Sequence, residues 1–192
     1  MNTRSLNTIA TFVASRLNKP NDLYLIEQIK WSLKYWRAIL FKREFDKRGD
    51  NGLYAQAFTI KLERLSESDC NTLVVGNCKV SRTVSKIPFP IRKNGGALFS
   101  FVGDRYFKTA YKEEYPETLD TSLYARFIGN RIKYYFNDNY LYIYGNKYLK
   151  EIGVRGTFED PEAVVDLCIN STNCFTEDEA FFIPLDMLHT II

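Results

Sequence analysis

The sequence predicts an α+β fold with an N-terminal helical hairpin, an antiparallel β-rich body and short C-terminal helices. Apolar residues first recur at helical spacing, the period changes to two residues after Gly52, and helix signals return after Asp160. The 192 residues, 45% of them hydrophobic, are enough to bury a core. We divide the chain into an N-terminal helical segment (1–50), a β-rich body (51–160) and a C-terminal helical segment (161–192), which we expect to form one structural unit.

Two helices are predicted before Gly52. Ser5 is a suitable cap for a helix over residues 5–17, and the Lys19–Asn21 segment breaks it. Asn21 or Asp22 then caps a longer helix that runs to about Arg48. The apolar stripe expected on this second helix is Leu23, Ile26, Ile29, Leu33, Trp36 and Leu40.

The body is predicted to consist of short strands. Around Phe58 and Ile60, apolar and polar residues alternate, which indicates a half-buried strand. Residues 131–136 and 140–144 flank Asn137–Asn139 and form the clearest hairpin pattern in the chain. Further strands are expected over 73–75, 78–84, 97–102 and 149–158, and residues 113–122 form an acidic loop.

Proline marks two other places. Pro88 and Pro90 lack a backbone donor, so residues 87–90 cannot lie in a central strand. Pro161 follows Asp160 as the first residue of a short helix expected to continue through Cys168. The apolar segment 185–192 is too short for a stable isolated helix, so we expect it to pack on its own domain or on a partner.

The chain lacks the residue patterns of catalysis. Its single histidine, His189, lies in a terminal segment where a catalytic base is hard to hold rigid. No glycine-rich phosphate-binding motif is present. The cysteines form no paired motif and are expected to be free thiols; they are Cys70, Cys78, Cys168 and Cys174. We therefore expect no enzymatic activity, no cofactor and no bound metal.

The charge balance argues against two other classes of protein. A net charge of +3 is too small for a dedicated nucleic-acid-binding protein. No apolar stretch has the length of a membrane helix, and the first residues do not resemble a signal peptide. We expect a protein made in the host cytoplasm, without a membrane partner.

The second helix has apolar residues on nearly all sides. Trp31 and Tyr35 accompany the apolar stripe, while Lys30, Lys34 and Arg37 form a basic row. A helix that is apolar on two faces must be covered on two faces, which a neighbouring subunit would achieve. A central helix wrapped by its own sheet is equally compatible with the pattern. We expect the basic row to face the acidic loop of a neighbouring copy.

Four segments of the body resemble the head-to-tail connector, or ring, proteins of crAss-like tailed bacteriophages. They are Ile87–Arg92, Phe99–Asp104, Tyr140–Asn146 and Ile152–Pro161. The resemblance covers most of the chain, but these are strand and turn patterns without chemical specificity. It implies no catalytic residues.

The resemblance implies a homo-oligomeric ring, usually dodecameric, stacked under the portal protein and beside other connector or tail proteins in the neck of the virion. The genome would pass through it with weak or no specific DNA binding. The alternatives are another tail or baseplate component and, from a different class, a nucleic-acid-binding or nuclease domain built on the acidic clusters. The expected interface residues are Lys30, Trp31, Lys34, Tyr35, Arg37, Pro88, Pro90, Glu113, Glu114, Pro116, Glu117, Leu188 and Ile191.

Overall fold

The computed structural model describes residues 5–48, 55–65, 80–92, 98–114, 132–146, 148–164, 167 and 181. The chain divides into two compact units. One, here called the helical unit, contains 1–56, 88–98 and 157–192. The other, the sheet unit, contains 57–87 and 99–156. The predicted three-segment division stays a prediction.

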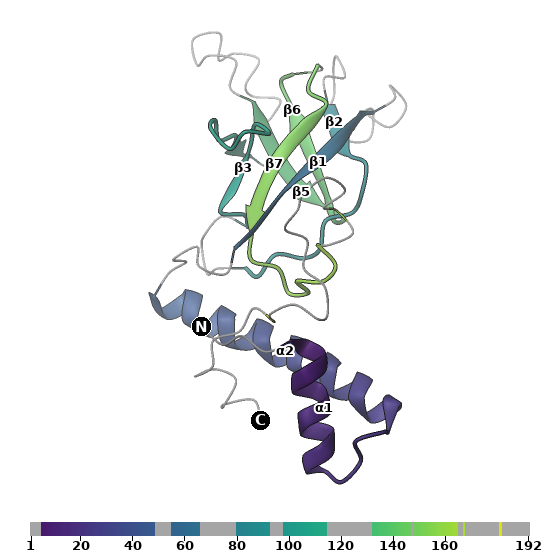
Figure 1. Cartoon of the computed structure of the whole chain (residues 1–192). Helices are drawn as coiled ribbons and strands as arrows, with labels where there is room; N and C mark the ends of the chain where they lie inside the picture. Colours follow the sequence, from purple (N-terminus) through teal and green to yellow (C-terminus); the bar gives the residue numbers. More distant parts are fainter. Residues whose placement is uncertain are drawn as a thin grey trace. The chain divides into compact units, whose positions relative to one another are not determined.

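The helical unit is built on the two predicted helices (Figure 1), α1 (Leu6–Arg16) and α2 (Leu23–Arg48). Ser5 Oγ accepts a hydrogen bond from Thr8 N at 3.2 Å, so the predicted cap of α1 is confirmed. Beyond α1, Asn18 adopts a left-handed conformation with φ 57°, which is typical after a helix end. Asp22 Oδ1 then accepts from Leu25 N at 3.1 Å and caps α2.

Two extended segments of this unit, around residues 89–91 and 157–159, hydrogen bond each other. Ile91 N donates to Thr157 O at 2.8 Å, and Glu159 N donates to Phe89 O at 3.0 Å. Pro90 forms an isolated antiparallel bridge with Phe158 and is not part of a strand. This agrees with the prediction that residues 87–90 do not lie in a central strand. Ile91 packs with Phe41 and Phe45 of α2 in one hydrophobic cluster.

The C-terminal helices of the prediction are not shown. Residues 161–164 form bends and a turn instead of the first turn of a helix. Asp160 Oδ1 accepts from Glu162 N at 3.0 Å, a local bond that stabilises a turn as readily as a helix start. The segment 185–192, His189 and the four cysteines lie outside the described residues.

The sheet unit contains seven strands: β1 (Gln56–Arg64, whose first residue belongs to the helical unit), β2 (Val80–Thr83), β3 (Phe101–Gly103), β4 (Lys112–Glu113), β5 (Lys133–Asn137), β6 (Tyr140–Tyr144) and β7 (Glu151–Gly156). Their order in the sheet is β3-β7-β1-β2-β6-β5-β4. The alternation predicted around Phe58 is confirmed, because Phe58 and Ile60 are buried while Thr59 and Lys61 are exposed.

The predicted hairpin is the pair β5–β6, with five residue pairs from Lys133↔Tyr144 to Asn137↔Tyr140. The two turn residues, Asp138 and Asn139, have φ of 48° and 66°. Positive φ at both central residues is the geometry of the type I′ turn, which matches the twist of the flanking strands.

The expected antiparallel body contains one parallel pair, β4–β5. A parallel pair needs a long crossover, and residues 114–132 supply it. The chain just before β4 also approaches the other end of the sheet, because Tyr111 N donates to Val102 O of β3 at 2.8 Å. Lys112 N donates to Ile132 O at 3.2 Å on the opposite side. The sheet is therefore mixed and nearly closed.

Candidate assembly interface

The outward side of α2 carries a row of exposed aromatic side chains. Tyr24, Trp31 and Tyr35 are spaced by seven and four residues, so they share one side of the helix. Their exposed fractions are 75%, 67% and 51%. A single exposed aromatic residue is ordinary, but a contiguous row on one helix is typical of a surface that contacts another protein.

The aromatic row is already ordered within the chain. The rings of Trp31 and Tyr35 are stacked with centroids 5.6 Å apart and planes 7° apart. Trp36, itself 47% exposed, meets Tyr35 edge to face at 5.7 Å. Rings that stack before binding lose little side-chain freedom on association, which favours a role as anchors.

The inward side of α2 differs from the predicted stripe. Leu23 and Trp36, expected to be buried, are 77% and 47% exposed. The buried positions are instead spaced by four residues; they are Leu33, Arg37, Phe41 and Phe45. The polar residue Arg37 lies in this buried row, so a pattern of hydrophobic residues alone could not identify the row.

The predicted basic row is largely engaged inside the chain. Arg37 is 0% exposed, and its Nη1 donates to Phe158 O at 2.9 Å. Lys34 Nζ forms ion pairs with Glu162 and, at 3.5 Å, with Asp160. Lys30 pairs with Glu27 at 2.8 Å. Arg37 therefore lies in the interior of its own chain, where its side chain has no surface to offer a neighbouring subunit.

Burial affects the two inner cations differently. Burial alone would lower the pKa of Lys34, but the hydrogen bond to Glu162 and the charge of Asp160 outweigh it, so the pKa lies above its usual value. Burial lowers the pKa of Arg37 to about 9, opposed by Asp160. Both groups remain cations at pH 7, and they tie α2 to residues 158–162.

The other predicted contact residues are spread over both units. Pro90 is buried and Pro88 is half-buried in the helical unit. Glu114 forms a 2.7 Å ion pair with Lys133 in the sheet unit, and Glu113 hydrogen bonds Tyr134. The remaining four lie outside the described residues; they are Pro116, Glu117, Leu188 and Ile191. A role of any of these residues in an interface stays a prediction.

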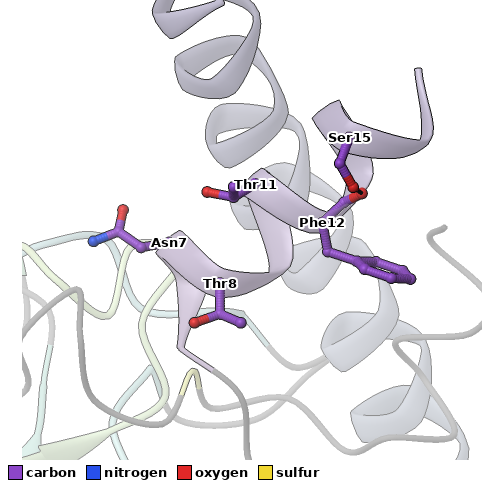
Figure 2. A pocket seen from close by; sticks show the side chains of 5 residues that line it. All are labelled: Asn7, Thr8, Thr11, Phe12 and Ser15. Carbon is purple, nitrogen blue, oxygen red and sulfur yellow. Dashed lines mark hydrogen bonds between the residues drawn. The ribbon is translucent and has the colours of Figure 1, made fainter. Parts of the chain in front are cut away.

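Sequence reasoning missed a second exposed surface, on α1. A shallow hollow of about 370 Å³ is lined by Asn7, Thr8, Thr11, Phe12 and Ser15 (Figure 2). Phe12 is 40% exposed, and the guanidinium of Arg16 lies 5.0 Å from the centre of its ring. The four-residue spacing of Thr8, Phe12 and Arg16 on the polar side of a short helix was the signal that could have identified it.

Within the part of the chain that the structure describes, no group of histidine, cysteine or acidic side chains is arranged to hold a metal ion. In the same residues, neither helix has the length and hydrophobicity of a membrane-spanning segment.

Comparison with protein families gives a match over residues 8–192, to the crAss family described as phage tail ring protein 2. The chain belongs to this family of phage tail ring proteins. The ring family identified from the body segments is thereby confirmed. No curated protein matches the chain.

Membership in a tail ring family gives the aromatic row on α2 a context. The family is one of structural components of the phage tail, not an enzyme family, and it places the protein in the virion. A ring protein assembles with other proteins of the tail, so an exposed row of anchors is an expected feature of its surface.

Proposed function

We propose that this protein forms a homo-oligomeric ring in the head-to-tail connector, below the portal protein, through which the phage genome passes. The observation that carries the proposal is the stacked, exposed aromatic row on α2 in a chain of the tail ring family. The ring is proposed to be dodecameric and to stack on neighbouring connector or tail proteins.

The energetics support self-assembly through this row. Burial of apolar surface contributes about 25 cal/mol per Å², and large aromatic side chains at the centre of an interface dominate its affinity. In the single chain, the side chain of Trp31 is 67% exposed and that of Tyr35 is 51% exposed. A neighbouring subunit that covers them supplies the second covered face that a helix of this composition requires.

The charges of the helical unit support a channel wall that does not grip DNA. Tight nonspecific binding needs several cations free to contact phosphates. Within the basic row of α2, Lys30 and Lys34 have carboxylate partners in the same chain and Arg37 is buried. The exposed cations on the same helix include Lys42, Arg43 and Lys47, near its C-terminal end. With a net charge of +3 for the whole chain, the subunit is suited to let DNA slide.

Stacking contacts to the portal and to adjacent tail proteins are proposed for three further segments. These are the proline segment around Pro88, the segment that runs from Glu113 through Pro116 and Glu117, and the C-terminal segment with Leu188 and Ile191. Proline stiffens a contact loop and lowers the entropy lost on binding.

The test is to image particles that carry a tag on this subunit. A ring of density directly below the portal supports the connector assignment. The Trp31→Asp variant should leave a folded monomer that fails to incorporate, because a charge at the centre of an apolar contact is costly. Normal incorporation of this variant would contradict the proposed interface.

A second placement, as a ring further down the tail, is favoured by the description of the family as tail ring proteins. The same images distinguish the two placements, because the tag would then lie in the tail, away from the portal.

A further inference from the structure

We propose that neighbouring copies contact one another front to back, with the outer row of α2 of one copy lying antiparallel on the outer row of α1 of the next. The α2 row is Glu27, Trp31 and Tyr35, and the α1 row is Thr8, Phe12 and Arg16. This inference rests on the proposed function, and it names the partner surface for the aromatic row.

A closed ring requires two different surfaces on each subunit. A surface that pairs with itself produces a two-fold dimer and then stops, whereas a head-to-tail contact repeats until the rotation closes. The aromatic row on α2 is only half of such a contact. The other half must be a different surface of the same chain that accepts aromatic side chains.

The outer side of α1 meets this requirement. Its buried residues are outside the α1 row; they are Leu6, Ile9, Ala10 and Ala14. Thr8 and Phe12 of its outer row line one edge of the shallow, open hollow on this helix (Figure 2), against which an aromatic side chain of a neighbour can lie. The lining combines the ring of Phe12 with hydroxyl groups, which suits the apolar body and polar edge of Trp and Tyr.

The two rows have the same spacing. In each row the residues are four positions apart, and rows of this kind pack into each other in the commonest class of helix contact. The α2 row is exposed, while Leu33 on the opposite side of the helix is 2% exposed. The outward rows of α1 and α2 are thus both available without any rearrangement of the chain.

Charge decides the relative direction of the helices. If Trp31 lies against Phe12 and the helices are antiparallel, Glu27 faces Arg16 and Tyr35 faces Thr8. The parallel direction would place Glu27 opposite Thr8 and leave the charge of Arg16 without a carboxylate. Glu27 pairs with Lys30 in its own helix, but its side chain is 69% exposed, so it can also accept a hydrogen bond from a neighbour.

The first experiment mixes two variants that each lack one surface. Trp31→Asp removes the α2 surface, and Phe12→Asp removes the α1 surface. By native mass spectrometry, each variant alone should be monomeric, whereas the mixture should give a one-to-one heterodimer, because one complete contact remains. Thr11→Arg, on the exposed lining of the hollow, replaces Phe12→Asp if that variant fails to fold. Tyr106→Asp, a 67% exposed aromatic residue of the sheet unit, is the control and should assemble normally.

The second experiment reverses the proposed ion pair. Glu27→Arg and Arg16→Glu should each weaken assembly by about tenfold, since like charges then face each other. The double variant restores opposite charges and should recover most of the loss. Both side-chain positions are on the surface, so each variant should fold, and circular dichroism checks this.

Three results would overturn the inference. If Phe12→Asp alone forms a dimer, α2 pairs with itself. If the wild-type chain forms a ring but the mixed variants give no heterodimer, the proposed function stands and this interface is wrong. If the wild-type chain stays monomeric at all concentrations, both self-assembly and the interface fail.

Discussion

The side chain of Arg37 is a cation placed where an apolar residue is usual. Its guanidinium lies 4.6 Å from the ring centre of Phe41 and 5.9 Å from that of Phe181, and it donates to the carbonyl oxygen of Phe158. The planar group can stack and donate at the same time, which an ammonium group cannot do. Arg37 therefore joins α2 to the segment at residue 158 through a hydrogen bond and to Phe181 through a ring contact.

We expect Arg37→Ala to lower the free energy of unfolding by about 3 kcal/mol, because it leaves the Phe158 carbonyl without its donor and opens a cavity beside Phe41. Urea denaturation measures this difference. Arg43→Ala, at an exposed position of the same helix, should change the value by less than about 0.5 kcal/mol. Equal effects of the two substitutions would show that the buried contacts of Arg37 contribute nothing.

Two neighbouring tyrosines should determine part of the alkaline stability. Burial raises the pKa of Tyr134 and Tyr135 well above the usual value, with further contributions from Glu113 and Tyr142 respectively. A raised pKa in the folded state means that the folded chain holds these protons more tightly. The resulting stabilisation is complete below about pH 10 and is lost as the pH rises further.

We expect Tyr135→Phe to be neutral or stabilising by up to about 1 kcal/mol at pH 7, because the buried hydroxyl has no hydrogen-bond partner among the described residues. Above pH 10 the variant should lose less stability than the wild type. Tyr134→Phe is the matched comparison and should cost about 1 kcal/mol at pH 7, since it removes the bond to Glu113. Stability measured from pH 7 to 11 tests both. A wild-type profile that is flat above pH 10 would contradict the argument.

Among the elements, the β5–β6 hairpin depends on its two-residue turn. Asn139 has φ of 66°, and its carbonyl oxygen also accepts from Ile87 N at 2.7 Å. Asn139→Gly should stabilise the sheet unit by a few tenths of a kcal/mol, because glycine adopts positive φ without a steric cost. Asn139→Val should destabilise it by about 1 kcal/mol, because a β-branched residue is strained there. Thermal unfolding of both variants provides the measurement, and the reverse order would exclude a type I′ turn.

Elements whose causes are local could be predicted from the sequence. Ser5 and Asp22 define helix starts, and Asp138 and Asn139 define the turn, through bonds and backbone angles that neighbouring residues decide. The parallel pairing of β4 with β5 could not be predicted. It joins a strand of two residues to a partner across a long crossover, and no periodic pattern exists in so short a strand.

Part of the candidate interface could be predicted from the pattern of residues along one helix. Trp31 and Tyr35 were identified because a helix with apolar residues on two sides needs two partners. Arg37 was assigned to the surface because charged residues are usually exposed. Its burial depends on contacts to Phe41 and Phe158, which the sequence pattern does not reveal. The α1 row was not predicted as a contact surface, because its polar side chains are typical of any solvent-exposed helix face.

For the whole molecule, we expect weak binding to duplex DNA. The monomeric Trp31→Asp variant should bind a labelled duplex with a Kd no tighter than about 10 μM at physiological salt, the range of ordinary nonspecific contacts. Fluorescence anisotropy measures this affinity. Lys42→Glu, which removes an exposed cation from α2, should weaken binding by less than about threefold. Submicromolar binding would show that the chain carries a dedicated DNA surface.

The nearly closed sheet also affects which contacts can form between neighbouring copies in the proposed ring. In the proposed ring, copies side by side would reach a very high local concentration, at which any open strand could become a template for further strands and for fibres. In the sheet unit, the segment at residues 109–114 hydrogen bonds β3 through Tyr111 and β5 through Glu114, whose N donates to Tyr134 O at 2.9 Å. These bonds occupy backbone groups of β3 and β5 to which a foreign strand could otherwise add. In the proposed ring, neighbouring copies would then meet through side chains, in contacts that close with the rotation of the ring.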